Sequence, residues 1–192
     1  MATRKAYRTM PWRDVQRLFP EMPKKSQIKT FYAAMGRTIG AWQIVEYELY
    51  EIYRACTRAN RPGAEAAAFY SVPAFRAKLN MASAAVEFAC LGHEALWKEW
   101  TTLRNRTDKK ADRRNEIAHG AVWTKFHEPR RDRKIYIGPN MMDIRQDIRR
   151  KPGQDAEPLT LKRLRGYEKD FRDLADSLRN FAQRIHPLPT PP

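Results

Sequence analysis

The chain has 192 residues, of which 42% are hydrophobic and 31% are charged. This balance is typical of a soluble globular domain rather than a disordered or fibrous chain, and the length suits one domain with its own hydrophobic core. Lysine and arginine outnumber aspartate and glutamate by 37 to 22, which gives a formal net charge of +15. Because such a charge attracts polyanions, nucleic acid is the first partner that we consider. The alternative is that the arginine-rich composition only keeps the protein soluble.

The sequence favours a protein of a reducing, aqueous compartment. No apolar run approaches the roughly 20 residues that a membrane-spanning helix needs. The basic N-terminus, residues 1–25, is interrupted by prolines and lacks the apolar core of a signal peptide. The two cysteines, Cys56 and Cys90, lie in apolar helical stretches, where a free thiol behaves as a small buried hydrophobe. We therefore expect a cytoplasmic protein that does not contact a membrane.

Apolar residues recur at helical spacing in four segments, and each pattern predicts an amphipathic helix. The four segments are 28–56, 75–89, 93–118 and 161–185. Gly92 is expected to stop the second helix, and Gly120 to cap the third at its C-terminal end. Thr160 is a good N-cap for the last helix.

Between the third and the last helix, residues 121–126 and 134–137 are rich in β-branched and aromatic side chains and predict a small β-hairpin. Four long helices with short connections predict an all-α fold, an antiparallel bundle of four to five helices with this hairpin inserted before the last helix. The expected parts are a basic N-terminal arm at 1–27, a helical domain at 28–186 and a proline-rich tail at 187–192.

The run from Arg114 to Gly120 contains the candidate site. The apolar stripe of the third helix, continued in register, reaches Arg114 where an apolar residue is expected, and such local exceptions are common at functional sites. Asn115 and His119 are four residues apart and share one helix face, with Arg114 beside it. Histidine exchanges protons near neutral pH, and arginine supplies a fixed cation for an anionic transition state. These groups suit cleavage of a phosphodiester by its own 2′-hydroxyl.

The same residues also have a purely structural interpretation. Arg114 can pair with Glu116 or Asp112, and Asn115 can cap a nearby group. His119 can be a helix-terminal cation that the helix dipole favours. From spacing alone, this is the commoner meaning of an arginine and a histidine near a helix end.

The run Arg114-Asn115-x-x-x-His119, at the end of the third helix, resembles the R-x4-6-H motif of the HEPN superfamily, in which a polar residue commonly follows the arginine. The resemblance covers roughly residues 28–185 and includes the Trp42-x-x-x-Glu46 stretch, the hairpin and the leucine-rich last helix, although only the motif is sharp. It implies a HEPN-type bundle in which Arg114 and His119 carry catalysis and Asn115 assists.

The resemblance further implies a metal-independent endoribonuclease without a cofactor, acting on RNA in toxin–antitoxin, anti-phage or RNA-processing systems. Two motifs would meet across a homodimer, and an antitoxin or defence-system partner would regulate them. One subgroup of the family has a tyrosine, modified by a partner nucleotidyltransferase, two residues after the histidine. Ala121 stands at that position here, so this route of regulation is in doubt.

Two other functions stay open on the sequence. Many HEPN domains have lost activity, so the alternative is a non-catalytic HEPN-like module that binds RNA, a nucleotide or a partner protein. A third, weaker hypothesis is a structural or DNA-binding helical protein that acts through its charge, although no helix-turn-helix signature supports it.

Several further residues are candidates for supporting roles. Glu46 could orient His119 from the first helix, or it could be an ordinary salt-bridged surface group. Basic residues that bracket the motif could contact phosphates, or could form a solvated face. These candidate RNA-binding residues are Lys109, Lys110, Arg113, Arg130 and Arg131. His127 and Glu128 do not have the spacing of metal ligands relative to His119, so we predict no metal site.

Overall fold

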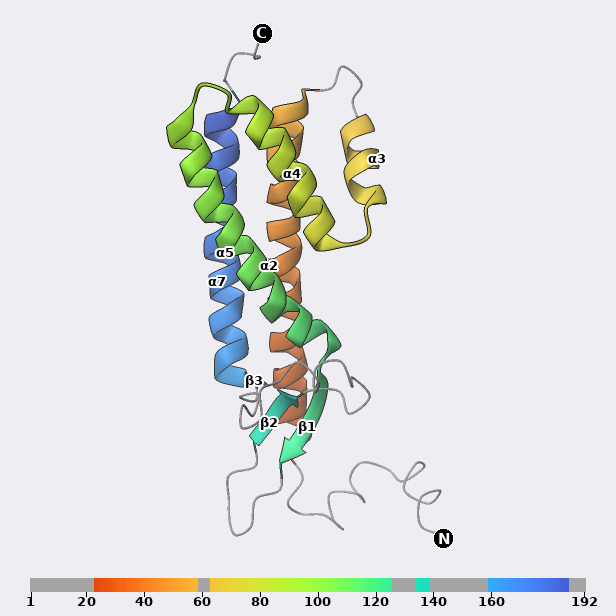
Figure 1. Cartoon of the computed structure of the whole chain (residues 1–192). Coiled ribbons are helices and arrows are strands. Elements are labelled where there is room, and N and C mark those ends of the chain that lie inside the picture. The colour runs from red at the N-terminus through yellow and green to blue at the C-terminus, as the bar shows by residue number, and fades with distance from the viewer. Residues whose placement is uncertain (1–22, 59–62, 126–133, 139–158, 187–192) are drawn as a thin grey trace, which may run out of the picture.

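The computed structural model (Figure 1) describes residues 23–58, 63–125, 134–138 and 159–186, and most of these residues are helical. The elements are α2 (Lys25–Thr57), α3 (Ala64–Ser71), α4 (Phe75–Ala89), α5 (Glu94–His119), β1 (Ala121–Lys125), β2 (Lys134–Gly138), β3 (Leu159–Thr160) and α7 (Leu161–Ile185). The predicted tail at 187–192 and residues 1–22 of the predicted arm lie outside the described residues. Among the described helices, none combines the length and apolar character needed to cross a bilayer.

The four helices predicted from spacing are present, and local sequence explains where they end. Gly92, between α4 and α5, has a φ of 81°, a left-handed conformation that glycine adopts without steric cost. Gly120 ends α5 and donates its N–H to the Glu116 carbonyl at 3.0 Å. Thr160 caps α7 as predicted, because its hydroxyl accepts a hydrogen bond from the backbone N–H of Arg163.

Helix α3 was not predicted, because its sequence lacks an amphipathic pattern. The segment Ala64–Ser71 is apolar almost all round, so no polar face marks it as helical. Its anchor is Phe69, which is fully buried and packs against Tyr50 and Tyr53 of α2 at ring-centroid distances of 5.6 and 5.7 Å. Helix α3 therefore packs on the bundle mainly through Phe69, with Tyr70 also contacting Tyr50 at 5.4 Å, rather than through an amphipathic stripe.

Helices α2 and α7 run parallel, as the first and last members of a bundle in which successive helices alternate in direction (Figure 1). Arg37 pairs with Glu168 at 3.3 Å, and Glu48 pairs with Arg179 at 2.7 Å. In both pairs the partners are 131 residues apart in the chain, so the two helices advance together. The reason is α3, which follows α2 in the chain and runs in the opposite direction. It adds one reversal of the chain before α4 begins (Figure 1).

The core lies between α2 and the helices around it. Trp42 is buried at the centre, with its ring 4.7 Å from that of Phe75 on α4 and 5.1 Å from that of Phe171 on α7. Trp100 on α5 packs against Phe181 on α7 at 5.5 Å. These aromatic contacts join four helices into one body.

A three-stranded antiparallel sheet, in the order β1-β2-β3, lies at one end of the bundle (Figure 1). It leads the chain from the end of α5 to the start of α7, close to the start of α2. Ile137 and Leu159, which are paired across β2 and β3, are both buried. The candidate motif lies at the same end of the bundle as this sheet (Figure 1). We call this end the sheet end.

Candidate functional site

The second half of α5 positions the candidate motif. Its buried stripe consists of Trp100, Leu103, Thr107, Ala111 and Ile117. Arg114 lies between the last two of these, three residues from each, and is half-buried. The sequence therefore located correctly the point where a cation interrupts the apolar stripe.

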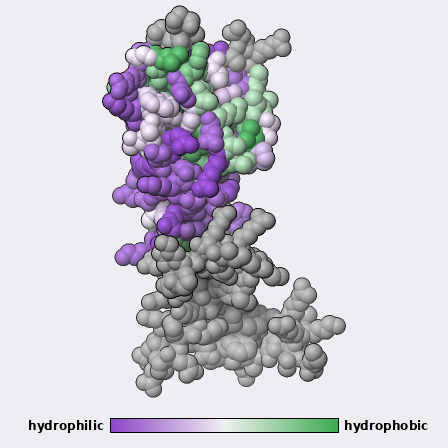
Figure 2. Space-filling view, viewed as in Figure 1, coloured by the Kyte–Doolittle hydropathy of each residue, from purple (hydrophilic) through white to green (hydrophobic). Residues whose placement is uncertain are grey.

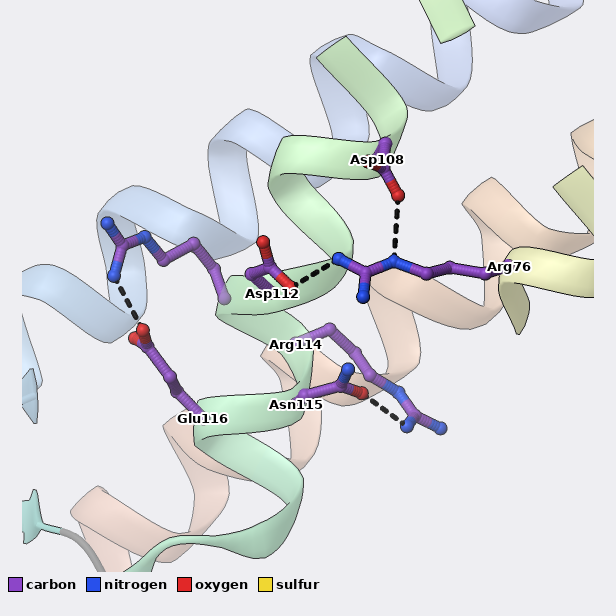
Figure 3. Close-up of polar contacts among 7 residues, drawn as sticks. Arg76, Asp108, Asp112, Arg114, Asn115 and Glu116 are labelled. Atoms are coloured by element: carbon purple, nitrogen blue, oxygen red, sulfur yellow. Dashed lines mark hydrogen bonds and ion pairs between the residues drawn. The ribbon is translucent and has the colours of Figure 1, made fainter. Parts of the chain in front are cut away.

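The guanidinium of Arg114 has no carboxylate partner among the described residues. Its Nη1 donates a hydrogen bond to the side-chain oxygen of Asn115 at 3.1 Å (Figure 3). Its Nε is buried and has no hydrogen-bond partner, and no other charged side chain in the described part of the chain has such an atom. A buried N–H without a hydrogen-bond acceptor is energetically unfavourable, so a ligand that supplies an acceptor for this N–H would be stabilised.

The carboxylates nearest to Arg114 in the sequence are bound to other arginines. Arg76 on α4 donates to Asp108 at 2.9 Å and to Asp112 at 2.7 Å (Figure 3). Arg113 donates to Glu116 at 2.6 Å. These hydrogen bonds raise the pKa of both guanidinium groups. The structural interpretation, in which Arg114 pairs with Asp112 or Glu116, is therefore not the arrangement found.

His119 is the last residue of α5, and its side chain is exposed. Asn115, one helical turn earlier, is exposed as well, so both side chains face solvent on the same side of the helix. His119 makes no side-chain hydrogen bond with any described residue, which leaves both ring nitrogens available. The last turns of α5 thus contain a cation held by an amide, and an accessible imidazole on the same face as that amide.

Glu46 is engaged elsewhere. Its carboxylate accepts a hydrogen bond from the Lys78 ammonium at 2.5 Å, and Lys78 also lies over the rings of Phe69 and Tyr70 at 5.5 and 5.2 Å. The Lys78 side chain is only 9% exposed. Glu46 therefore stabilises the packing of α4 on α2 through an ion pair. Of the two roles considered for Glu46, the structure favours this salt bridge over the orientation of His119.

Of the predicted RNA-binding residues around the motif, only some are available to a ligand. Lys109 is exposed and forms no ion pair with a described residue. Lys110 forms an ion pair with Asp170 on α7, and Arg113 is bound to Glu116. Arg130 and Arg131 lie outside the described residues. Among the predicted RNA-binding residues that the structure describes, only Lys109 is therefore without an ion pair.

The sequence reasoning missed Arg76, since no local pattern marks an exposed arginine near a helix start. His127 and Glu128 lie outside the described residues. Elsewhere in the described part, no group of three or more histidine, cysteine, aspartate or glutamate side chains is arranged to hold a metal ion. The groups that can do chemistry here are those of Arg114, Asn115 and His119.

Comparisons with models of known protein families, with curated proteins and with solved structures find no match to this chain.

Proposed function

We propose that the chain is a metal-independent endoribonuclease of the HEPN type, with a site formed by Arg114, Asn115 and His119. The observation that carries the proposal is the state of Arg114: among the described residues its buried Nε–H has no hydrogen-bond partner, and its guanidinium bonds to the Asn115 amide rather than to a carboxylate. The planar guanidinium of an arginine matches the geometry of a phosphate and can donate two parallel hydrogen bonds to it. An arginine kept free of acids on a basic chain is therefore well suited to bind RNA.

The reaction that fits these groups is transesterification within the RNA strand. The 2′-oxygen attacks the adjacent phosphorus while the bond from phosphorus to the 5′-oxygen breaks, which leaves a 2′,3′-cyclic phosphate. A neutral His119 takes the proton from the 2′-hydroxyl, and a protonated imidazole gives one to the departing 5′-oxygen. Arg114 stabilises the negative charge that builds up on the phosphate oxygens, and Asn115 holds the guanidinium in place.

Two imidazoles in opposite protonation states are supplied if the protein acts as a homodimer. A two-fold axis beside the end of α5 would place His119 and Arg114 of both copies in one cleft. The resemblance to the HEPN superfamily supports this arrangement, and we propose with it a role in a toxin–antitoxin or anti-phage system that includes a regulatory partner. The oligomeric state in solution, measured by sedimentation, tests the dimer: a strict monomer that still cleaves RNA would contradict it.

The test of the activity is RNA cleavage in the presence of EDTA, with the cyclic phosphate as the diagnostic product. We expect Arg114→Ala to lower the rate about 10² to 10³-fold, and His119→Ala to lower it about 10² to 10⁴-fold. The double variant Arg113→Gln/Glu116→Gln is the matched control, since it removes the neighbouring arginine together with the carboxylate that it binds. The rate of this variant should stay within a few-fold of that of the wild type.

Two outcomes would contradict the proposal. Cleavage that requires an added metal ion, or that survives both substitutions, excludes this mechanism. Binding of RNA without cleavage under any condition favours instead the non-catalytic module that the sequence left open.

A further inference from the structure

Exposed, unpaired cations gather at the sheet end of the bundle. These are Lys25 and Lys29 on α2 and Lys162, Arg165 and Lys169 on α7, none of which forms an ion pair with a described residue. At the opposite end, three cations are bound to carboxylates: Arg54 to Glu51, Lys98 to Glu94 and Arg184 to Glu99. On the face shown in Figure 2, hydrophilic residues gather over the half of the described bundle near the sheet, and hydrophobic ones toward the other end.

The uneven distribution follows from the sequence once the helices are known to be parallel. Helix α2 contains no acidic residue before Glu46, and α7 contains none before Glu168. Because α2 and α7 run in the same direction, both acid-free starts lie at the sheet end. An antiparallel pair would have placed them at opposite ends, so the basic end is a consequence of the topology.

A hollow with an aromatic side chain lies among these cations. Lys25, Ile28, Lys29 and Tyr32 line it, on one face of the first two turns of α2, and we call these four residues the α2 surface. Tyr32 is 53% exposed, although an aromatic ring usually packs into a core. The surface thus combines an aromatic ring and an isoleucine with two ammonium groups on one helix face.

The α2 surface lies at the same height along the bundle as the candidate site. Arg37 is bound to Glu168, and Lys110 is bound to Asp170 one half-turn further along α7. From Lys110, His119 lies about 13 Å closer to the sheet; from Arg37, Lys29 lies about 12 Å closer, at 1.5 Å of rise per residue. A strand that reaches His119 therefore also reaches the level of Tyr32 and Lys29.

We infer that the α2 surface binds single-stranded RNA, with one base stacked on the Tyr32 ring and the flanking phosphates bound by Lys25 and Lys29. Aromatic rings within a basic surface are the common means of holding unpaired strands, because every base has a face that can stack. A duplex keeps its bases stacked on each other and cannot use the ring in this way. The inference rests on the proposed function for the choice of RNA, and it specifies how the strand is held.

The first test measures binding of a short single-stranded RNA by fluorescence anisotropy. Tyr32→Ala should weaken binding about 5- to 100-fold, and Tyr32→Phe should stay close to the wild type, since the ring remains. Tyr70→Ala is the matched control, because Tyr70 is 51% exposed but lies on α3. Replacing one base of the RNA by an abasic nucleotide at each position in turn should reveal one position at which the effect of Tyr32→Ala disappears.

The second test measures how the affinity depends on salt. Neutralising two phosphate contacts in the variant Lys25→Gln/Lys29→Gln should reduce the slope of log K against log salt by about 1.4. The control Arg54→Gln/Lys98→Gln removes the same charge from the opposite end and should leave the slope unchanged. An equal effect of the two double variants would mean that only net charge matters, and would overturn the inference.

Two further outcomes separate this inference from the proposed function. If the protein cleaves RNA through Arg114 and His119 while Tyr32→Ala changes neither the affinity nor KM, the inference is wrong and the proposed function stands. If the RNA binds through Tyr32 but is never cleaved, the inference stands and the proposed function fails. If Tyr32→Ala changes only the sedimentation of the protein, the α2 surface is a contact between copies of the chain, and the inference is again wrong.

Discussion

Arg76 on α4 donates a hydrogen bond to Asp112 on α5 at 2.7 Å. The carboxylate two residues before Arg114 is therefore paired with Arg76 and not with Arg114. The position of Arg76 is well fixed, because the residue before it, Phe75, packs on Trp42, and Lys78 is bound to Glu46. The start of α4 thus supplies an arginine that binds two carboxylates close to the candidate site, although α4 contributes no residue to that site. Its arginine neutralises acids that would otherwise repel a phosphate near Arg114.

Arg76→Gln should therefore weaken RNA binding although Arg76 is outside the proposed site. We expect roughly a three- to tenfold loss of affinity, since two uncompensated carboxylates then act across a short, partly solvated distance. Restoring neutrality in Arg76→Gln/Asp108→Asn/Asp112→Asn should return most of the lost affinity. Arg54→Gln, which removes one charge at the far end, is the control, and an effect as large as that of Arg76→Gln would show that the position of the charge is irrelevant.

Phe69→Ala should strongly destabilise the protein, because Phe69 is the buried anchor of α3. Truncation of a fully buried phenylalanine costs about 3 to 5 kcal/mol of unfolding free energy. Tyr70→Ala, on the same helix but half-exposed, should cost about 1 kcal/mol or less. Urea denaturation of the two variants measures the difference. Equal losses would mean that α3 is not anchored as described.

The parallel packing of α2 and α7 can be tested through Glu48 and Arg179. Glu48 is only 5% exposed at its side chain, whereas that of Arg179 is 47% exposed, so solvent weakens their interaction. A double-mutant cycle with Glu48→Gln and Arg179→Gln should give a coupling of about 1 to 2 kcal/mol. The exposed pair Glu94 and Lys98 should give less than about 0.5 kcal/mol. If the coupling between Glu48 and Arg179 is absent, the two helices do not pack in this register.

Alkaline pH should reduce stability in part through Cys56. Burial, with a smaller effect of the nearby Cys90, raises the pKa of the Cys56 thiol from its ordinary 9.0 to about 12. Between these values the unfolded chain loses the proton and the folded protein keeps it, so this stabilisation is complete below pH 9 and is lost as the pH rises. Urea denaturation from pH 8 to 10.5 should show the decline. Cys56→Ala should make it shallower by up to about 1.4 kcal/mol per pH unit, and an unchanged slope would contradict the assignment.

The local features of this protein could be predicted from short stretches of its sequence. Helical spacing predicted α2, α4, α5 and α7, and Gly92 and Thr160 marked ends that the structure confirms. The interruption of the α5 stripe at Arg114 was also visible, since burial along one helix follows from its own periodicity. Each of these features depends on residues within a few positions of one another, which is why the sequence contains them.

The contacts between distant segments depend instead on how the helices pack. Helix α3 has no amphipathic pattern, so its reversal of the chain, and with it the parallel packing of α2 and α7, could not be read from spacing. The partners Arg76 and Lys78 come from α4, and whether they bind Asp112 and Glu46 depends on which helices lie side by side. Ion pairs between distant segments are set by packing rather than by local order, and the pairing of Asp108 and Asp112 with Arg76 leaves Arg114 without a carboxylate partner among the described residues.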